Sequence, residues 1–202
     1  MDIAESRDFG ISTGPWEAQE YRPYTTPLAT GYFLSVWKKQ TDGIWKVILD
    51  AGSTTPVRAG YDHAFSFPTG VDKPFTNPKR VNVESSCAEL MKMEKHFLAL
   101  WKTNPHPDIY SSFLTPHARM QREGHFPTTH PDTINAWISQ LHKTLTWEPV
   151  GSGVASSGDL GFTYGLFEMP DNPNGTKEHY VRIWKKQQTG KWMIALEMMS
   201  ID

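Results

Sequence analysis

The segment from His117 to Arg122, "HARMQR", carries the side chains of this chain that are best suited to chemistry. Imidazole groups in general titrate near neutral pH, so His117 is a candidate general base. Alternate residues of a strand face opposite sides, so as a strand the segment would present two sets of side chains. One set is His117, Arg119 and Gln121, and the other is Ala118, Met120 and Arg122. Either set is a candidate lining for a pocket, and a His117 bonded only to backbone is the alternative.

Four histidines raise the question of a metal site: His106, His117, His125 and His130. The closest pair, His125 and His130, is five residues apart, whereas ligands on one helix face are three or four residues apart. No cysteine or carboxylate stands at ligand spacing, so the sequence predicts no metal site. It also lacks a phosphate-binding loop, a nucleophile elbow and a dinucleotide fingerprint, which predicts that no cofactor is bound.

Composition narrows the class of partner. The chain has 202 residues, a formal net charge of −2 and 12% aromatic residues, which predicts a sizeable core and no electrostatic attraction to nucleic acid or anionic membrane. Its apolar runs are too short to span a bilayer. The residues after Met1 do not resemble a signal peptide, although a longer gene product could be exported, so the compartment stays open. The single cysteine, Cys87, is interpreted as a small structural residue.

An internal repeat organises the chain. "WKKQTDGIW", from Trp37 to Trp45, matches "WKKQQTGKW", from Trp184 to Trp192, at six of nine positions. Upstream, residues 3–17 match residues 154–168 and share an Asp-x-Gly step, a later glycine and a final glutamate. The offset is 151 residues in the upstream block and 147 in the downstream one, as a longer loop in the first copy would produce. The two blocks indicate a duplication.

Both copies have the pattern of β structure. Segments rich in aromatic and β-branched residues alternate with turn residues, which predicts that each copy ends in a three-stranded antiparallel meander. The "TDG" at 41–43 is a hairpin signal. Only the second copy is preceded by predicted helices, at 85–102, 106–114 and 130–145, with a strand at 118–124. This order predicts an α+β fold with helices on one face of a curved sheet.

The second copy, with "LTWEPV", "SGDLGFTYG" and "YVRIWKKQQTGKW", resembles the nuclear transport factor 2-like superfamily, and most closely its SnoaL-like and domain-of-unknown-function branch. The resemblance covers 85–202 fully and 1–52 as the C-terminal half of such a domain. It implies a cystatin-like cone, in which a bent antiparallel sheet wraps around N-terminal helices and encloses a pocket. It also implies frequent dimerisation through the sheet. Relatives include cofactor-free isomerases, dehydratases and cyclases beside members without known activity.

The resemblance also implies roles for particular residues. Many members of this branch carry an acidic pair where this chain has Pro116 and His117, so His117 would be a substitute base. Arg122 stands where an arginine is expected and would bind an anionic ligand at the cavity mouth, with a plain surface arginine as the alternative. Five aromatic residues fall where a cone would have its lining: Tyr110, Trp147, Phe162, Tyr164 and Tyr180.

The organisation that follows is a partial cone domain at 1–52, a connector at 53–84 and a complete cone domain at 85–202. A half-sheet without helices would expose an apolar face, which is costly unless it is covered. Three explanations remain open: the start is internal to a longer gene, the half-sheet packs on the second domain or a partner, or it folds poorly.

We therefore expect a cone that binds a small, partly apolar molecule and is non-catalytic. The alternatives are a cofactor-free isomerase, dehydratase or hydrolase that uses a histidine or carboxylate base, and a dimerisation scaffold. A homodimer is expected, and neither nucleic acid nor membrane is expected as a partner.

Overall fold

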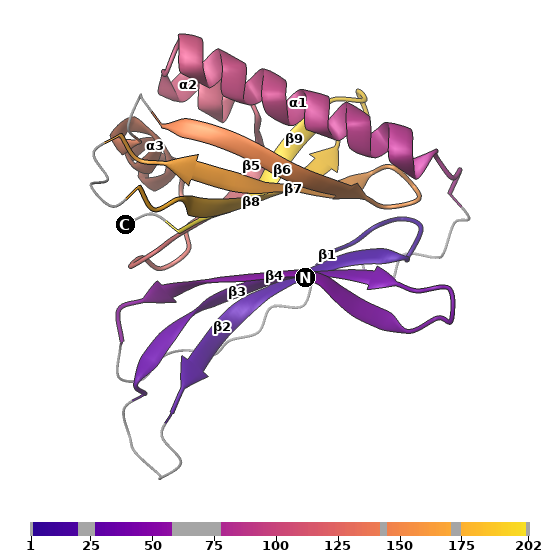
Figure 1. The fold of residues 1–202 in the computed structure, drawn as a ribbon, viewed down its shortest axis with the longest axis horizontal. Coiled ribbons are helices and arrows are strands. Elements are labelled where there is room, and N and C mark those ends of the chain that lie inside the picture. Colours follow the sequence, from indigo (N-terminus) through magenta and orange to yellow (C-terminus); the bar gives the residue numbers. More distant parts are fainter. Residues whose placement is uncertain (1, 20–26, 58–77, 142–144, 171–174, 201–202) are drawn as a thin grey trace.

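The fold consists of two β-sheets that pack face to face, with helices on the far side of one of them (Figure 1). The computed structural model describes residues 2–19, 27–57, 78–141, 145–170 and 175–200. Within these ranges no helix is long and apolar enough to cross a membrane.

The first sheet comes from the first copy of the repeat. Its strands are antiparallel neighbours in chain order: β1 (Asp2–Ile3), β2 (Phe9–Ala18), β3 (Ala29–Lys39) and β4 (Trp45–Thr55). The hairpin between β3 and β4 turns at the predicted position, where Gly43 has a φ of 83°. Only glycine adopts this conformation without strain, so the turn signal was sufficient here.

The second sheet has the order β5-β9-β8-β7-β6. Its strands are β5 (Leu114–Arg122), β6 (Thr146–Val154), β7 (Leu160–Glu168), β8 (Glu178–Lys186) and β9 (Trp192–Met199). The predicted meander is confirmed as β7, β8 and β9, and β6 extends it antiparallel to β7. β5 joins β9 in parallel orientation, which the long connection between them permits.

In the described part of the chain, three helices precede or interrupt the second sheet: α1 (Val83–Thr103), α2 (Pro107–Ser111) and α3 (Pro131–Gln140). α1 begins two residues before the predicted start, because Asn82 is its N-cap and the Asn82 side chain accepts the backbone N–H of Ser85. α2 and α3 are shorter than predicted. Pro107 and Pro131 open them, as their lack of a backbone N–H favours.

The helices cover one face of the second sheet and form a cone with it (Figure 1). α1 buries Leu90, Phe97 and Trp101, spaced seven and four residues apart, against the aromatic strand residues Trp184 and Trp192. This arrangement confirms the predicted α+β cone fold.

The opposite face of the second sheet is covered by the first sheet. Phe9, Ile11, Leu34 and Val36 of β2 and β3 form one buried cluster with residues of β7, β8 and β9, including Phe162 and Ile183. The first sheet therefore packs against the outer face of the second copy of the repeat, and the face that helices cover in the second copy points away from this contact.

The matched turns of the two copies also touch. The hydroxyls of Ser6 and Ser157 lie 2.8 Å apart, and these residues are equivalent in the repeat. Asp159 accepts the backbone N–H of Glu5, and Asp8 accepts that of Ser156. Partial burial opposes ionisation of Asp8, but hydrogen bonds from Ser156 and Ser6 hold its pKa below the ordinary value. The two copies thus meet with the reciprocal contacts of a two-fold pair.

Candidate functional site

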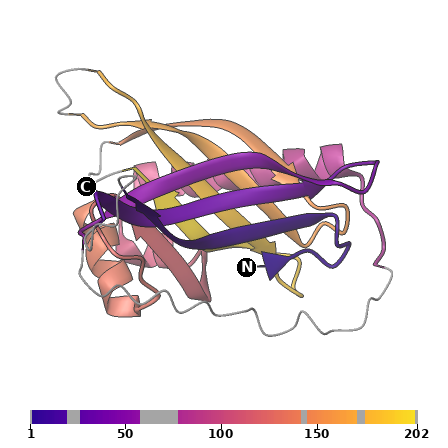
Figure 2. The ribbon, with the colours of Figure 1, turned by 90° about the horizontal axis from the view of Figure 1, so that it is seen from below.

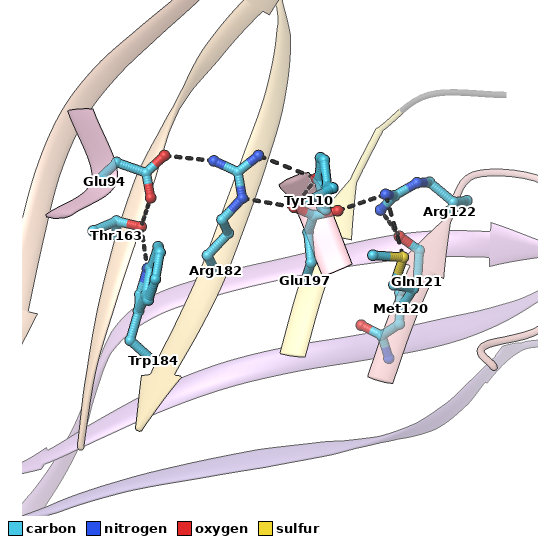
Figure 3. A network of polar contacts seen from close by, with 9 residues as sticks. All are labelled: Glu94, Tyr110, Met120, Gln121, Arg122, Thr163, Arg182, Trp184 and Glu197. Atoms are coloured by element: carbon cyan, nitrogen blue, oxygen red, sulfur yellow. Dashed lines mark hydrogen bonds and ion pairs between the residues drawn. The ribbon is translucent and has the colours of Figure 1, made fainter. Parts of the chain in front are cut away.

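The interior of the cone is built around Arg182, at the centre of β8 (Figure 3). Its side chain is completely buried. Nη1 lies 2.5 Å from a carboxylate oxygen of Glu94 on α1, and Nε lies 2.6 Å from one of Glu197, its register partner on β9. Such a buried cation persists only with paired and hydrogen-bonded anions, which both glutamates supply.

A second arginine completes the network. Nη2 of Arg122 lies 2.5 Å from the other oxygen of Glu197, and the hydroxyl of Tyr110 also donates to this carboxylate. On the other side, Thr163 donates to Glu94 over 2.7 Å and accepts the indole N–H of Trp184 over 2.8 Å. Two carboxylates and two guanidinium groups leave the interior electrically neutral.

The network opposes acid–base catalysis in the cone. Burial alone would raise the pKa of Glu197, but Arg122, Arg182 and the hydrogen bond from Tyr110 lower it to about 2. Burial and the adjacent Glu197 raise the pKa of Tyr110. A general base at neutral pH needs a pKa near neutrality, and Glu197 is far from it.

Aromatic rings fill the space around Arg182. Its guanidinium carbon lies 4.8 Å from the ring centroid of Phe97, 4.7 Å from that of Trp147 and 4.4 Å from that of Tyr180. Cation–π contacts at these distances stabilise a desolvated arginine. The centre of the cone is therefore occupied by its own side chains.

A cleft of about 490 Å³ lies at the rim of the cone, between α1 and β6. Leu98, Leu145 and Trp147 line it, with Lys95 and Lys102 at its edge. The buried indole N–H of Trp147 has no hydrogen-bond partner among the described residues. A polar ligand atom or a water molecule would satisfy it.

A groove of about 840 Å³ lies between the two sheets, along β4 of the first sheet and β6, β7 and β8 of the second. We call it the intersheet groove. Ile48, Leu49 and Ala51 line it from β4, and Val150, Phe162, Tyr164, Leu166 and Val181 line it from β6, β7 and β8. Three of its large apolar side chains are well exposed: Ile48 at 43%, Val150 at 52% and Tyr164 at 37%. Lys38 and His179 add polar groups to the lining.

A smaller groove of about 370 Å³ lies along β5 and β9 beside the first sheet. It includes Thr115, Pro116 and His117 together with Asp2 and Lys185. His117 is exposed there, on the outer side of the sheet rather than inside the cone.

The structure divides the predicted site residues between two opposite faces of the sheet. Four lie inside the cone, namely Tyr110, Arg122, Trp147 and Tyr180. Five lie on the outer face or between the sheets, namely His117, Arg119, Gln121, Phe162 and Tyr164. The expectation that all five aromatic residues line the cone is therefore wrong for Phe162 and Tyr164. Their strand neighbour Thr163 occupies the interior, and alternation sends the two rings outward.

On β5 the set with Arg122 faces the cone, and the set with His117 faces outward. Gln121 donates to the hydroxyl of Thr13 over 2.9 Å, and Arg119 lies over the ring of Tyr32, so both connect the two sheets. The expected surface position of Arg122 is wrong as well, because it is almost completely buried against Glu197.

Three residues of the interior were missed: Glu94, Arg182 and Glu197. Each carried a signal, because a charged residue stands within an apolar pattern. Glu94 follows Leu90 by four residues on the apolar face of α1, and Arg182 and Glu197 interrupt the buried runs of β8 and β9. Charges at core positions are rare unless they are paired, so opposite charges at such positions indicate a buried network.

Among known proteins, similarity to this chain is found with solved structures and not with protein-family models or curated sequences. No protein-family model matches the chain, and none of the curated proteins matches it. Among solved structures it is similar to an NTF-2 like protein of unknown function from Shewanella oneidensis, with 12% identity, 56% of this chain and 97% of that chain covered, and a TM-score of 0.45. A ketosteroid isomerase-like protein from Erwinia carotovora atroseptica has 16% identity over 58% and 92% of the two chains, with a TM-score of 0.43.

An NTF2-like protein of unknown function from Pseudomonas putida has 11% identity over 59% and 89% of the two chains, with a TM-score of 0.47. The element order and the cone itself carry the assignment of the fold, and at these identities the similarity says nothing about activity.

Proposed function

We propose that this chain binds a small, partly apolar molecule in the intersheet groove and does not transform it. The observation that carries the proposal is the groove itself, which has the volume of a small-molecule site and a lining drawn from both copies of the repeat. The neutral interior, which its own side chains fill and in which the pKa of Glu197 is lowered, supports a structural role for the cone.

The lining defines the class of ligand. Apolar side chains from β4, β6 and β7 flank the groove, which favours an elongated molecule with a hydrocarbon or aromatic body. Lys38 and His179 lie on the lining of this groove, so a single anionic group on the ligand would find a partner. Asp50 and Cys87 also lie on the lining, and no second carboxylate accompanies Asp50 there in the described part of the chain.

A titration with 1-anilinonaphthalene-8-sulfonate tests the proposal, because this probe is aromatic and carries one anionic group. We expect saturable binding that Val150→Asp and Tyr164→Asp each weaken about tenfold, since a carboxylate in an apolar site loses hydration. Ile44→Asp is the matched control: Ile44 is 58% exposed and lies outside the groove. Equal weakening by all three substitutions, or by none, would refute the groove as the site.

Native mass spectrometry of the gently purified chain adds an independent measurement. We expect a retained small molecule on the unmodified protein and its loss from the Val150→Asp variant. Its mass would also restrict the chemistry of the natural ligand.

A second proposal concerns assembly. The resemblance implied a homodimer through the outer face of the cone sheet, and β2, β3 and β4 of the same chain cover this face. We propose that any homodimer of this chain uses another surface. Light scattering during size-exclusion chromatography, repeated with Leu34→Asp at the intersheet contact, would test this. A dimer that this substitution abolishes while the chain stays folded would contradict the proposal.

A further inference from the structure

The first sheet has a second face, directed away from the cone, that repeats the composition of the cone interior. The repeat pairs its residues with interior residues: Trp37 with Trp184, Trp45 with Trp192, Phe33 with Tyr180, Ser35 with Arg182, Asp50 with Glu197, Ser12 with Thr163 and Trp16 with Phe167. We call Ser12, Trp16, Phe33, Ser35, Trp37, Trp45 and Asp50 the outer aromatic face.

The hydrogen bonds on the outer aromatic face also correspond to those in the cone interior, as the two sequences do. The indole N–H of Trp37 donates to the hydroxyl of Ser12 over 2.8 Å, as that of Trp184 donates to Thr163 over 2.8 Å in the cone. The hydroxyl of Ser35 donates to Asp50 over 2.6 Å, across the same strand pair that joins Arg182 to Glu197 in the second copy. The outer aromatic face is therefore built as the interior of a cone.

The two faces differ in what covers them. In the cone, Trp184, Trp192, Phe167 and Tyr180 are at most 1% exposed because the helices lie over them. Their counterparts on the first sheet are only partly buried. Figure 2 shows β2, β3 and β4 in front of the molecule with no helix of the described chain over them. A row of tryptophan rings on an uncovered sheet is typical of an interaction surface.

The charges of the face indicate what binds there. In the cone, Glu197 is matched by Arg122 and Arg182. On the first sheet a serine stands at the position of Arg182, so the hydroxyl of Ser35 is the one partner of the Asp50 carboxylate within the described residues. Lys39, at the hairpin end of β3, pairs across the strands with Trp45 rather than with Asp50. An incoming positive charge above Ser35 would complete the arrangement.

From these observations we propose that the outer aromatic face docks an amphipathic helix of a partner protein, with large apolar side chains along one face and an arginine or lysine placed above Asp50. The helix would take the place that α1 takes on the second sheet, where Glu94 reaches the residue equivalent to Ser35. Because the first sheet offers a carboxylate without an arginine, the bound helix needs the charge opposite to that of Glu94.

The probe is a synthetic peptide with the sequence of α1, Val83–Thr103, carrying Cys87→Ser and a fluorescent label, and a second peptide with Glu94→Arg in addition. Anisotropy titrations use the full-length chain. We expect the arginine peptide to bind about fivefold more tightly than the glutamate peptide, the effect of one partly buried ion pair. Asp50→Asn in the full-length chain should abolish this preference.

Asp42→Asn is the control, because Asp42 lies in the neighbouring hairpin and an asparagine can accept the same backbone N–H of Ile44. This variant should keep the preference for the arginine peptide. A preference that survives Asp50→Asn, or no binding of either peptide, would overturn the proposal. A chain that dimerises by itself, with a dimer that Trp45→Glu dissociates, would assign the face to a second copy and equally overturn it.

Discussion

Replacing Arg182 by methionine tests the role of the buried network most directly. Methionine occupies a similar volume, so the substitution removes the charge with little loss of packing. It leaves Glu94 buried with the hydroxyl of Thr163 as its remaining hydrogen-bond partner among the described residues, while Glu197 keeps Arg122 and Tyr110. Breaking a buried ion pair by removing one member costs about 3–5 kcal/mol, because the remaining charge is uncompensated.

The dependence on pH gives the prediction a second readout. In the unmodified chain the pKa of Glu197 falls from an ordinary 4.5 to about 2, which corresponds to about 3 kcal/mol of stability. Since the folded pKa is the lower one, this stability is present above pH 4.5 and is lost as the pH falls towards 2. In Arg182→Met, Glu197 loses one of the two cations that lower its pKa, so lowering the pH from 7 to 3 should cost the variant less stability than it costs the unmodified chain.

Urea denaturation at pH 7 and pH 3, followed by tryptophan fluorescence, measures both effects. The double variant Arg182→Met with Glu94→Gln should recover about 2 kcal/mol relative to the single variant, because no unpaired charge remains on α1. If the single variant fails to fold at pH 7, the double variant should still fold. A single variant destabilised by less than about 1 kcal/mol, or a double variant as unstable as the single one, would refute the interpretation of the network.

Three further predictions concern other parts of the molecule. Gly31→Ala should destabilise the chain by more than about 2 kcal/mol in thermal unfolding, because the new Cβ would lie 2.1 Å from a backbone oxygen. Gly52→Ala is the comparison: the atom nearest to its new Cβ would lie at 3.4 Å, so this substitution should cost under about 1 kcal/mol. Leu34→Ala should cost about 2–5 kcal/mol, since Leu34 is fully buried between the sheets, and calorimetry should still show one transition if the two sheets unfold together. His117→Ala should change the free energy of unfolding, measured by urea denaturation, by no more than about 0.5 kcal/mol, because the imidazole is exposed. A larger loss would show that His117 makes a structural contact.

Local patterns were enough to predict the strands and the helix of the cone. The two "WKKQ" blocks end in tryptophan after a glycine turn, and this combination specifies a hairpin wherever it occurs. The spacing of Leu90, Phe97 and Trp101 places them on one face of a helix irrespective of context. The predicted helix ends were less accurate, because the start of α1 at Asn82 and the length of α2 depend on individual hydrogen bonds of the capping residues.

The candidate site was predicted only in part. Alternation along β5 correctly divided the side chains of 117–122 into two sets, but it contains no information on which set faces the helices. Arg122 on β5 and Thr163 on β7 face the interior of the cone. His117, Phe162 and Tyr164 therefore lie on the outer face of the sheet and not in the cone, where they were expected.

By itself, the sequence determined the repeat, the strand and helix periods and therefore an α+β fold with helices on one face of a curved sheet, because these depend on residues close together in the chain. Only the tertiary structure decided that Glu94, Arg182 and Glu197 meet in one neutral network, and that the first sheet covers the second. Charge pairing and sheet packing join residues up to about 190 positions apart, and their free energy depends on burial that no local pattern contains.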